Sequence, residues 1–217
     1  MLESTQENSI ETTETSNEEL TQELTQDQAA LAIKTSVDLP LWLSVICEAA
    51  SVDSKREAIN HILIEVNTQD AQSIIVATDG HMLVKLLTND IFGLKTGCYL
   101  INASEFTQET KCALLKNKNA ASCNVKLCNE NNVGTYPDYK QVIPKKSDKM
   151  NSASIGVDVD QLKKIQSILL RLDKQQVKKC KNDHDVISVN MRDDCSPMLL
   201  NVNCNESIIG VLMPCSI

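Results

Sequence analysis

Three histidines are the residues around which acid–base catalysis would have to be built in this chain. They are His61, His81 and His184, and Asp79 lies two residues before His81. Proton transfer needs an acid–base group beside a nucleophile or a third orienting side chain, and none of these histidines has a Ser or Cys at a suitable spacing. The sequence also has no phosphate-binding glycine loop and no paired-carboxylate motif. We therefore expect neither catalysis nor a cofactor.

Nine cysteines are the remaining reactive side chains: Cys47, Cys98, Cys112, Cys123, Cys128, Cys180, Cys195, Cys204 and Cys215. None belongs to a Cys-x-x-Cys pair, and the spacing of Cys123, Cys128 and His184 fits no usual zinc pattern. Because no secretory signal precedes them, we expect reduced, buried thiols in a cytoplasmic protein without a metal. No apolar run approaches the roughly 18–20 residues that cross a bilayer, so we expect no membrane segment.

The charge of the chain is concentrated at its start. Residues 1–30 hold eight acidic residues and no Lys or Arg, whereas the whole chain has 29 acidic and 21 basic residues. This composition predicts a disordered acidic tail over residues 1–30, which is either a solubilising segment or a regulatory or partner-binding arm. The rest of the chain is neutral and poor in aromatic residues, so binding to single-stranded nucleic acid is disfavoured and duplex DNA would need a local basic face.

The apolar pattern predicts helices and antiparallel strands in alternation. Asp38 and Pro40 favour a helix starting near Leu41. Asp79-Gly80, between two apolar runs, predicts a hairpin with a type I′ turn. Two capping boxes follow: Asn102 and Glu105 start a helix to about Lys116, and Asp158 and Gln161 start another. The apolar stripe of that last helix is Val159, Leu162, Ile165, Leu169 and Leu172.

A unit of one strand, one helix and several antiparallel strands thus begins near Val37, Cys98 and Ser154. Strands over Val186–Met191, Met198–Val202 and Ile208–Met213 close the chain as a meander. Repetition of such half-domains predicts an α+β fold with helices on one face of the sheets, not a parallel doubly wound sheet.

Three stretches, in order, resemble signature segments of the bacterial DNA polymerase III beta subunit, the beta sliding clamp. Residues 76–84 (VATDGHMLV) are similar to a strand–turn–strand of the clamp's middle domain. Residues 136–144 (YPDYKQVIP) are similar to its link to the last domain, and residues 211–217 (VLMPCSI) to its methionine–proline end. The resemblance implies a shortened DNA-clamp-like chain, with residues 37–146 like the middle domain and residues 147–217 like part of the C-terminal domain.

The resemblance also implies two sites. The partner-peptide site would be lined by residues of the three stretches: Thr78, Gly80, His81, Leu83, Pro137, Gln141, Val142, Val211, Met213, Pro214 and Cys215. The DNA-binding residues would lie on the last helix and in a loop that faces DNA in the family: Lys163, Lys164, Arg171, Lys174, Lys55 and Arg56. Gln141 replaces an Arg of the family pattern and Cys215 a Met, which implies a less basic and roomier pocket.

The implied function is that of a DNA-replication processivity factor. Such a protein would hold DNA polymerase and other clamp-motif proteins on duplex DNA without reading its sequence, would meet a clamp loader, and would form a homo-oligomer, as a trimer or a dimer. An adaptor or decoy that binds clamp-motif peptides without forming a ring is the alternative. An unrelated α+β interaction protein is a third.

Overall fold

The fold is given by a computed structural model that describes residues 35–53, 55–128, 133–144, 156–176, 187–190, 197–202 and 205–214. These residues fall within one compact unit. The acidic segment 1–30 and the first half of the predicted strand at residues 154–157 lie outside the described residues.

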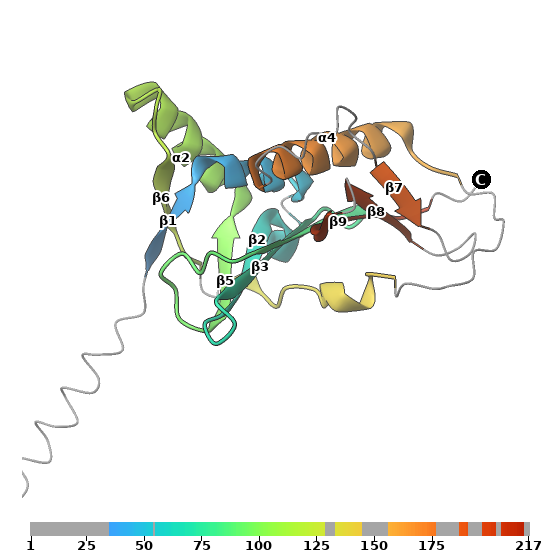
Figure 1. Cartoon of the computed structure of the whole chain (residues 1–217), viewed down its shortest axis with the longest axis horizontal. Helices are drawn as coiled ribbons and strands as arrows, with labels where there is room; N and C mark the ends of the chain where they lie inside the picture. Colours follow the sequence, from blue (N-terminus) through green and yellow to red (C-terminus); the bar gives the residue numbers. More distant parts are fainter. Residues whose placement is uncertain are drawn as a thin grey trace, which may run out of the picture. The chain divides into compact units, whose positions relative to one another are not determined.

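The described strands form two antiparallel sheets (Figure 1). The larger sheet has the order β5-β2-β3-β4-β9-β8-β7, and the smaller one pairs β1 with β6. The strands are β1 Ser36–Pro40, β2 His61–Asn67, β3 Gln72–Thr78, β4 Met82–Thr88, β5 Gly97–Asn102, β6 Ser122–Lys126, β7 Ile187–Asn190, β8 Met198–Val202 and β9 Asn205–Leu212. The predicted C-terminal meander is confirmed, since β7 pairs with β8 and β8 with β9.

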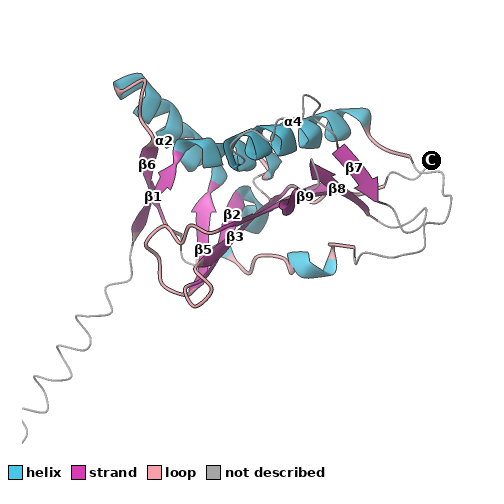
Figure 2. Ribbon diagram, viewed as in Figure 1, coloured by secondary structure: helices cyan, strands magenta, loops and turns pink. Residues whose placement is uncertain are grey.

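The helices cover one face of the large sheet (Figure 2). They are the 3-10 helix η1 (Leu41–Ala49) and the α-helices α2 (Ala103–Lys116) and α4 (Val159–Gln176). A second short 3-10 helix, η2 (Glu57–Asn60), precedes β2. The segment with η3 (Tyr139–Gln141) runs along the opposite face. The expected α+β fold with helices on one face of the sheets is therefore confirmed.

Local capping signals define where the two α-helices begin. The Asn102 side chain accepts hydrogen bonds from the N–H groups of Ser104 and Glu105. Asp158 Oδ1 accepts in the same way from Asp160 (2.8 Å) and Gln161 (3.2 Å). Both predicted N-termini are confirmed, because a side-chain oxygen that satisfies the first free N–H groups fixes the start of a helix.

Two details of the predicted helices are wrong. Asp38 does not cap the first helix, because it lies inside β1, where it pairs with Asn124 of β6. Val159 is not part of the buried stripe of α4, since its side chain is 59% exposed, whereas Ile165, Leu169 and Leu172 are fully buried. Val159 is the first residue of α4, and the fully buried part of the stripe begins only in later turns.

The large sheet buries apolar side chains on both faces. Met82, Val84 and Leu86 of β4 pack into the core beneath the helices, whereas Leu83 lies in a second apolar cluster on the opposite face. This division follows from the two-residue period of a strand. The sheet is thus covered by helices on one side and by an irregular segment on the other.

Candidate partner-binding site

The hairpin tip, residues 78–82, is fixed by its own side chains. Thr78 Oγ1 donates to the Met82 carbonyl oxygen at 2.7 Å and accepts from the Gly80 N–H at 3.1 Å. Asp79 Oδ1 accepts from the N–H groups of His81 and Met82, both at 2.9 Å. The predicted hairpin is confirmed but the type I′ turn is wrong: Gly80 has φ +90°, while Asp79 has no positive φ. The Asp79 carboxylate stabilises the turn in place of a second left-handed residue.

The last strand lies directly beside this hairpin. β4 pairs with β9 in a register that sets Leu83 opposite Val211 and Met82 opposite Leu212. One residue further on, the Met213 N–H donates to the His81 carbonyl oxygen at 2.9 Å. The first and third stretches that resemble clamp segments are therefore neighbours in one sheet.

The connector, residues 133–144, contains the second stretch and covers the sheet face opposite the helices. Its Tyr136 hydroxyl donates to the Val76 carbonyl oxygen at 3.4 Å. Its Tyr139 hydroxyl donates to Glu65 Oε2 at 2.7 Å, and Lys140 Nζ lies 3.3 Å from the same carboxylate oxygen. The buried residues of the apolar cluster between connector and sheet are Leu63, Val76, Leu83, Leu100, Tyr136, Tyr139, Leu199 and Val211.

The structure thus brings the three stretches together, but at different depths. Thr78, Leu83 and Val211 are buried, with Leu83 and Val211 only 3% and 1% exposed. Around them, the half-buried or exposed residues are Gly80, His81, Pro137, Gln141, Val142, Met213 and Pro214. Gln141 Nε2 donates to Asp138 Oδ2 at 2.9 Å. Cys215 lies outside the described residues. The buried residues are therefore the floor of this surface and the others are its accessible rim.

The tyrosine that anchors the connector predicts a loss of stability in alkaline solution. Burial raises the pKa of the Tyr136 phenol, whereas an unfolded tyrosine titrates near pH ~10. The stabilisation from keeping this phenol protonated is complete below pH ~10 and is lost as the pH rises above that value. At pH 11 we expect Tyr136→Phe to be more stable than the wild type by about 1 kcal/mol.

Urea denaturation of both proteins at pH 8 and pH 11 measures this difference. At pH 8 the wild type should be equal to or slightly more stable than Tyr136→Phe, since the phenylalanine loses only one long hydrogen bond. Other groups that titrate in alkaline solution affect both proteins equally. An unchanged difference between pH 8 and pH 11 would mean that the phenol is open to solvent.

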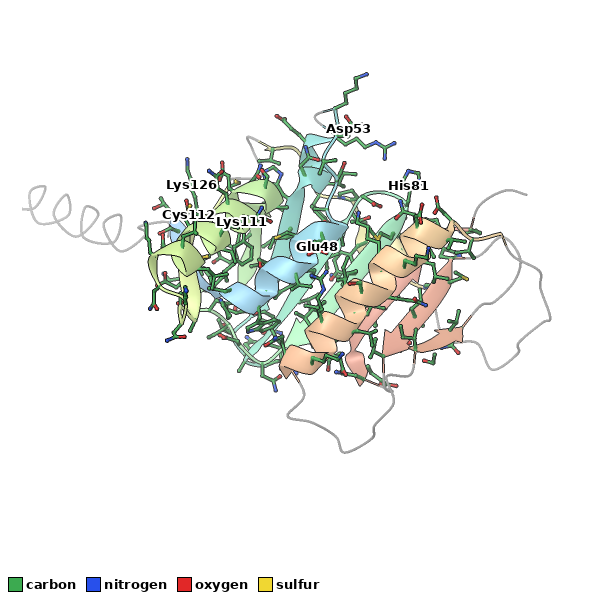
Figure 3. All side chains as sticks on the ribbon, turned by 90° about the horizontal axis from the view of Figure 1, so that it is seen from above. Glu48, Asp53, His81, Lys111, Cys112 and Lys126 are labelled. Carbon is green, nitrogen blue, oxygen red and sulfur yellow. The ribbon has the colours of Figure 1, made fainter. Side chains whose placement is uncertain are left out.

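A cavity of about 370 Å³ lies behind the hairpin tip, on the helical side of the sheet. It is lined by the end of η1 and the loop after it, by Arg56, by Asp79 and His81, and by Lys164 of α4. Figure 3 shows His81 and Asp53 at the same end of the helical layer. No sequence signal indicated this cavity, because it forms only where η1 and α4 pack side by side.

The predicted DNA-binding residues are partly engaged within the protein. Arg171 makes a bidentate ion pair with Glu48 of η1. Its Nη1 lies 2.9 Å from Oε1, and its Nη2 contacts Oε2. Lys164 Nζ lies 3.6 Å from Asp79 Oδ2 at the hairpin tip. These two contacts fasten α4 to the first half of the chain, and sequence reasoning missed Glu48 as a partner.

The other predicted DNA-binding residues lie nearer to solvent. Lys163 is exposed and pairs weakly with Asp160 at 3.8 Å, and Lys174 is exposed near the end of α4. Lys55 and Arg56 are exposed in the loop before η2. The structure brings Arg56 to the same cavity as Lys164, while Lys163 faces away from the sheet.

The structure has free thiols at Cys47, Cys112, Cys123 and Cys128. Burial raises the pKa of the Cys47 thiol to about 12, so it stays uncharged at neutral pH. Within the described ranges no His, Cys, Asp and Glu side chains gather in a group of three or more that could hold a metal ion. None of the helices described is long and apolar enough to span a membrane.

Solved structures of bacterial sliding clamps are similar to this chain. The DNA polymerase III beta subunit from Thermotoga maritima has a TM-score of 0.51 and 15% identity over 84% of this chain and 66% of that chain. The DNA polymerase sliding clamp from Bacillus subtilis has a TM-score of 0.52 and 14% identity over 86% of this chain and 65% of that chain. The sliding clamp from Pseudomonas aeruginosa has a TM-score of 0.53 and 15% identity over 84% of this chain and 66% of that chain. No protein-family model and no curated protein matches the sequence.

The protein therefore has the fold of the DNA polymerase sliding clamps. At 14–15% identity the similarity concerns the fold. The chain spans 65–66% of the length of these three clamp chains.

Proposed function

We propose that this protein is a sliding-clamp-like replication accessory, a processivity factor that holds DNA polymerase and other clamp-motif proteins on duplex DNA in the cytoplasm. One observation carries the proposal: the hairpin tip, the connector and the end of β9 meet at one surface, joined by the hydrogen bond from Met213 to His81. The fold of the sliding clamps supports it. The protein itself would have no catalytic activity.

The partner peptide would lie on the rim described above. Gly80 has no side chain, so the Arg56 guanidinium lies against the turn beside the rim. Met213 can adapt its shape to an apolar side chain of the peptide. Pro137 and Pro214 would form stiff apolar edges. Leu83 and Val211 would act from below by holding the hairpin, the last strand and the connector in register. Gln141 is neutral, which leaves the rim less basic than in the family pattern.

The helical face would meet duplex DNA. Clamps encircle DNA without reading its sequence, so their contacts need cations that approach phosphates. Lys163 and Lys174 of α4 are exposed and suit this role. In this proposal residues 37–146 correspond to a clamp middle domain and residues 147–217 to part of a last domain. Several copies would have to associate to close a ring, and a clamp loader would open it.

An adaptor or decoy without a ring is the second candidate. The observation that favours it is the engagement of Arg171 by Glu48 and of Lys164 by Asp79. Each of these ion pairs removes a cation from the set that could contact phosphates. Such a protein would keep the peptide surface and bind DNA weakly.

Retention on circular DNA tests the proposal. We expect the protein to elute as an oligomer, with a mass by light scattering that is a multiple of 24.0 kDa. After loading it should stay on a nicked circular duplex in high salt and slide off once that duplex is linearised, because a ring is held by topology and not by ion pairs.

Two other outcomes discriminate the candidates. A monomer that binds a clamp-motif peptide but shows no difference between circular and linear DNA would establish the adaptor. A monomer that binds neither peptide nor DNA would contradict both. The matched control is Met213→Ala, which removes an apolar side chain from the rim but keeps the backbone hydrogen bond to His81.

A further inference from the structure

We propose that Arg56 selects an acidic side chain in the peptide that binds at the hairpin tip. This inference rests on the proposed peptide-binding function and adds to it the chemistry of the ligand. The resemblance to the clamps places Arg56 among the DNA-binding residues and implies a less basic peptide site, because Gln141 replaces an Arg of the family pattern. The structure supplies a cation to that site from a different segment.

Arg56 lies against the backbone of the hairpin tip. Its Nη1 is only 2.8 Å from the position that a Cβ atom of Gly80 would occupy, and Ile59 Cδ1 is 3.9 Å from the same point. Nη1 also donates a long hydrogen bond of 3.5 Å to the Asp79 carbonyl oxygen. Because Gly80 has no side chain, the guanidinium can rest directly on the turn, next to the rim formed by His81.

Arg56 differs from the neighbouring cations in its charge environment. Lys164, Lys140 and Arg171 are paired with Asp79, Glu65 and Glu48 respectively. Among the described residues no carboxylate lies within 4.0 Å of the Arg56 guanidinium, which is exposed to solvent. Its charge is therefore available to a ligand.

The acidic residues of the adjacent cavity are engaged elsewhere. Asp79 Oδ1 accepts two backbone N–H groups and its Oδ2 faces Lys164. Asp53 Oδ1 accepts from the Lys55 N–H at 2.9 Å, and Glu48 is held by Arg171. A single carboxylate can thus approach Arg56. The planar guanidinium can donate two parallel N–H hydrogen bonds to the two oxygens of a carboxylate.

The same carboxylates make a DNA backbone a poorer ligand for Arg56. A duplex presents a continuous row of phosphates, and Asp53, Asp79 and Glu48 line the cavity that such a row would have to cross. Glu48 and Asp79 are paired with cations, but among the described residues Asp53 has no basic partner. Its charge opposes each further phosphate that follows the first, whereas a single acidic side chain brings no second charge. The surroundings of Arg56 therefore favour a peptide ligand with one Asp or Glu.

A double-mutant cycle between protein and peptide tests the proposal. The probes are fluorescent clamp-motif peptides, each with a single Asp at a different position. Each has a control peptide with Asn in place of that Asp. Fluorescence anisotropy gives the dissociation constants. We expect the full-length wild type to prefer Asp over Asn at one position by about fivefold to tenfold.

Three variants separate the charge of Arg56 from its shape. Arg56→Gln should reduce the ratio of the Asn and Asp dissociation constants to about twofold or less. Arg56→Lys should keep part of the preference, because the charge remains but the planar guanidinium is lost. Lys116→Gln, which removes one exposed positive charge at the end of α2, should keep the full preference. Thermal unfolding of each variant shows whether the fold is intact.

The outcomes distinguish this proposal from the proposed function. If the wild type binds none of the peptides, the proposed function itself fails before any Asp is compared with Asn. If peptides bind but no position prefers Asp, or if Arg56→Gln keeps the preference, the role of Arg56 is wrong while the peptide site stands. If Arg56→Gln weakens binding to duplex DNA and leaves the peptide preference unchanged, Arg56 is a phosphate contact and the proposal is overturned.

Discussion

Replacing Gly210 with valine is expected to lower the free energy of unfolding by about 2–3 kcal/mol. Gly210 lies in β9 under α4, and a Cβ atom there would be 2.8 Å from Leu169 Cδ1 and 3.0 Å from Ile165 Cδ1. Both of these side chains are fully buried, so they cannot move aside without disturbing the core. The absence of a side chain at Gly210 is what allows α4 to lie close to the sheet.

Urea denaturation monitored by circular dichroism measures this effect. Gly210→Ala should fall between the wild type and Gly210→Val, because it adds one carbon at the same point. Combined with Leu169→Ala, the alanine at 210 should cost less than it does alone, since the colliding methyl group is gone. A Gly210→Val protein as stable as the wild type would show that α4 does not pack on β9 at this position.

Replacing Tyr136 with alanine is expected to cost about 3 kcal/mol and to detach the connector from the sheet. Tyr136 is 7% exposed and packs in the apolar cluster with Leu83 and Val211. Without the ring the cluster loses one of the two buried tyrosines of the connector, and a cavity is left. The helical side of the sheet has a separate core, which should remain folded.

Limited proteolysis detects the detachment. Trypsin should cut after Lys140 in Tyr136→Ala faster than in the wild type, because local opening exposes the connector. The control is Tyr136→Phe, which keeps the ring and should be cut at the wild-type rate at neutral pH. Equal rates for Tyr136→Ala and the wild type would mean that the connector is held by other contacts, such as the pair of Tyr139 with Glu65. Peptide affinity should fall in parallel with the detachment if the proposed site is correct.

The parts of the fold that were predictable from the sequence depend on neighbours along the chain. Asn102 and Asp158 cap helices by bonding to N–H groups two and three residues later, so a capping box is visible without any tertiary information. The strands of the C-terminal meander were predictable for the same reason, because short apolar runs separated by polar residues indicate strands. The repeated half-domain pattern then pointed to an α+β fold.

The errors have two different physical origins. Asp38 is a residue type that often caps helices, but the pairing of β1 with β6 holds it in a strand. The Asp79-Gly80 pair favours a turn with two left-handed residues, whereas in the structure the Asp79 side chain accepts the N–H groups of His81 and Met82 and Asp79 has no positive φ. The partner of Asp38 was chosen by the tertiary structure, whereas the partners of Asp79 lie within the turn itself.

The candidate site shows the same division. The residues of the three stretches were predictable from their resemblance to clamp segments, but not their depth: Leu83 and Val211 lie beneath the connector, and Gly80 and His81 lie at the surface. The contact of Arg56 with Gly80 was not predictable, since neither residue carries a pattern that pairs it with the other.

The sequence by itself determined the order of strands and helices, the caps that start α2 and α4, and the likeness of three segments to clamp segments, because these depend on residues close together in the chain. The tertiary structure alone decided that residues 123 positions apart, Glu48 and Arg171, form an ion pair. It likewise decided that β9 lies beside β4 and that a cation reaches the hairpin tip from the loop before η2. Such contacts form only when separate apolar surfaces pack together, and the burial of those surfaces, not any local motif, selects which distant residues meet.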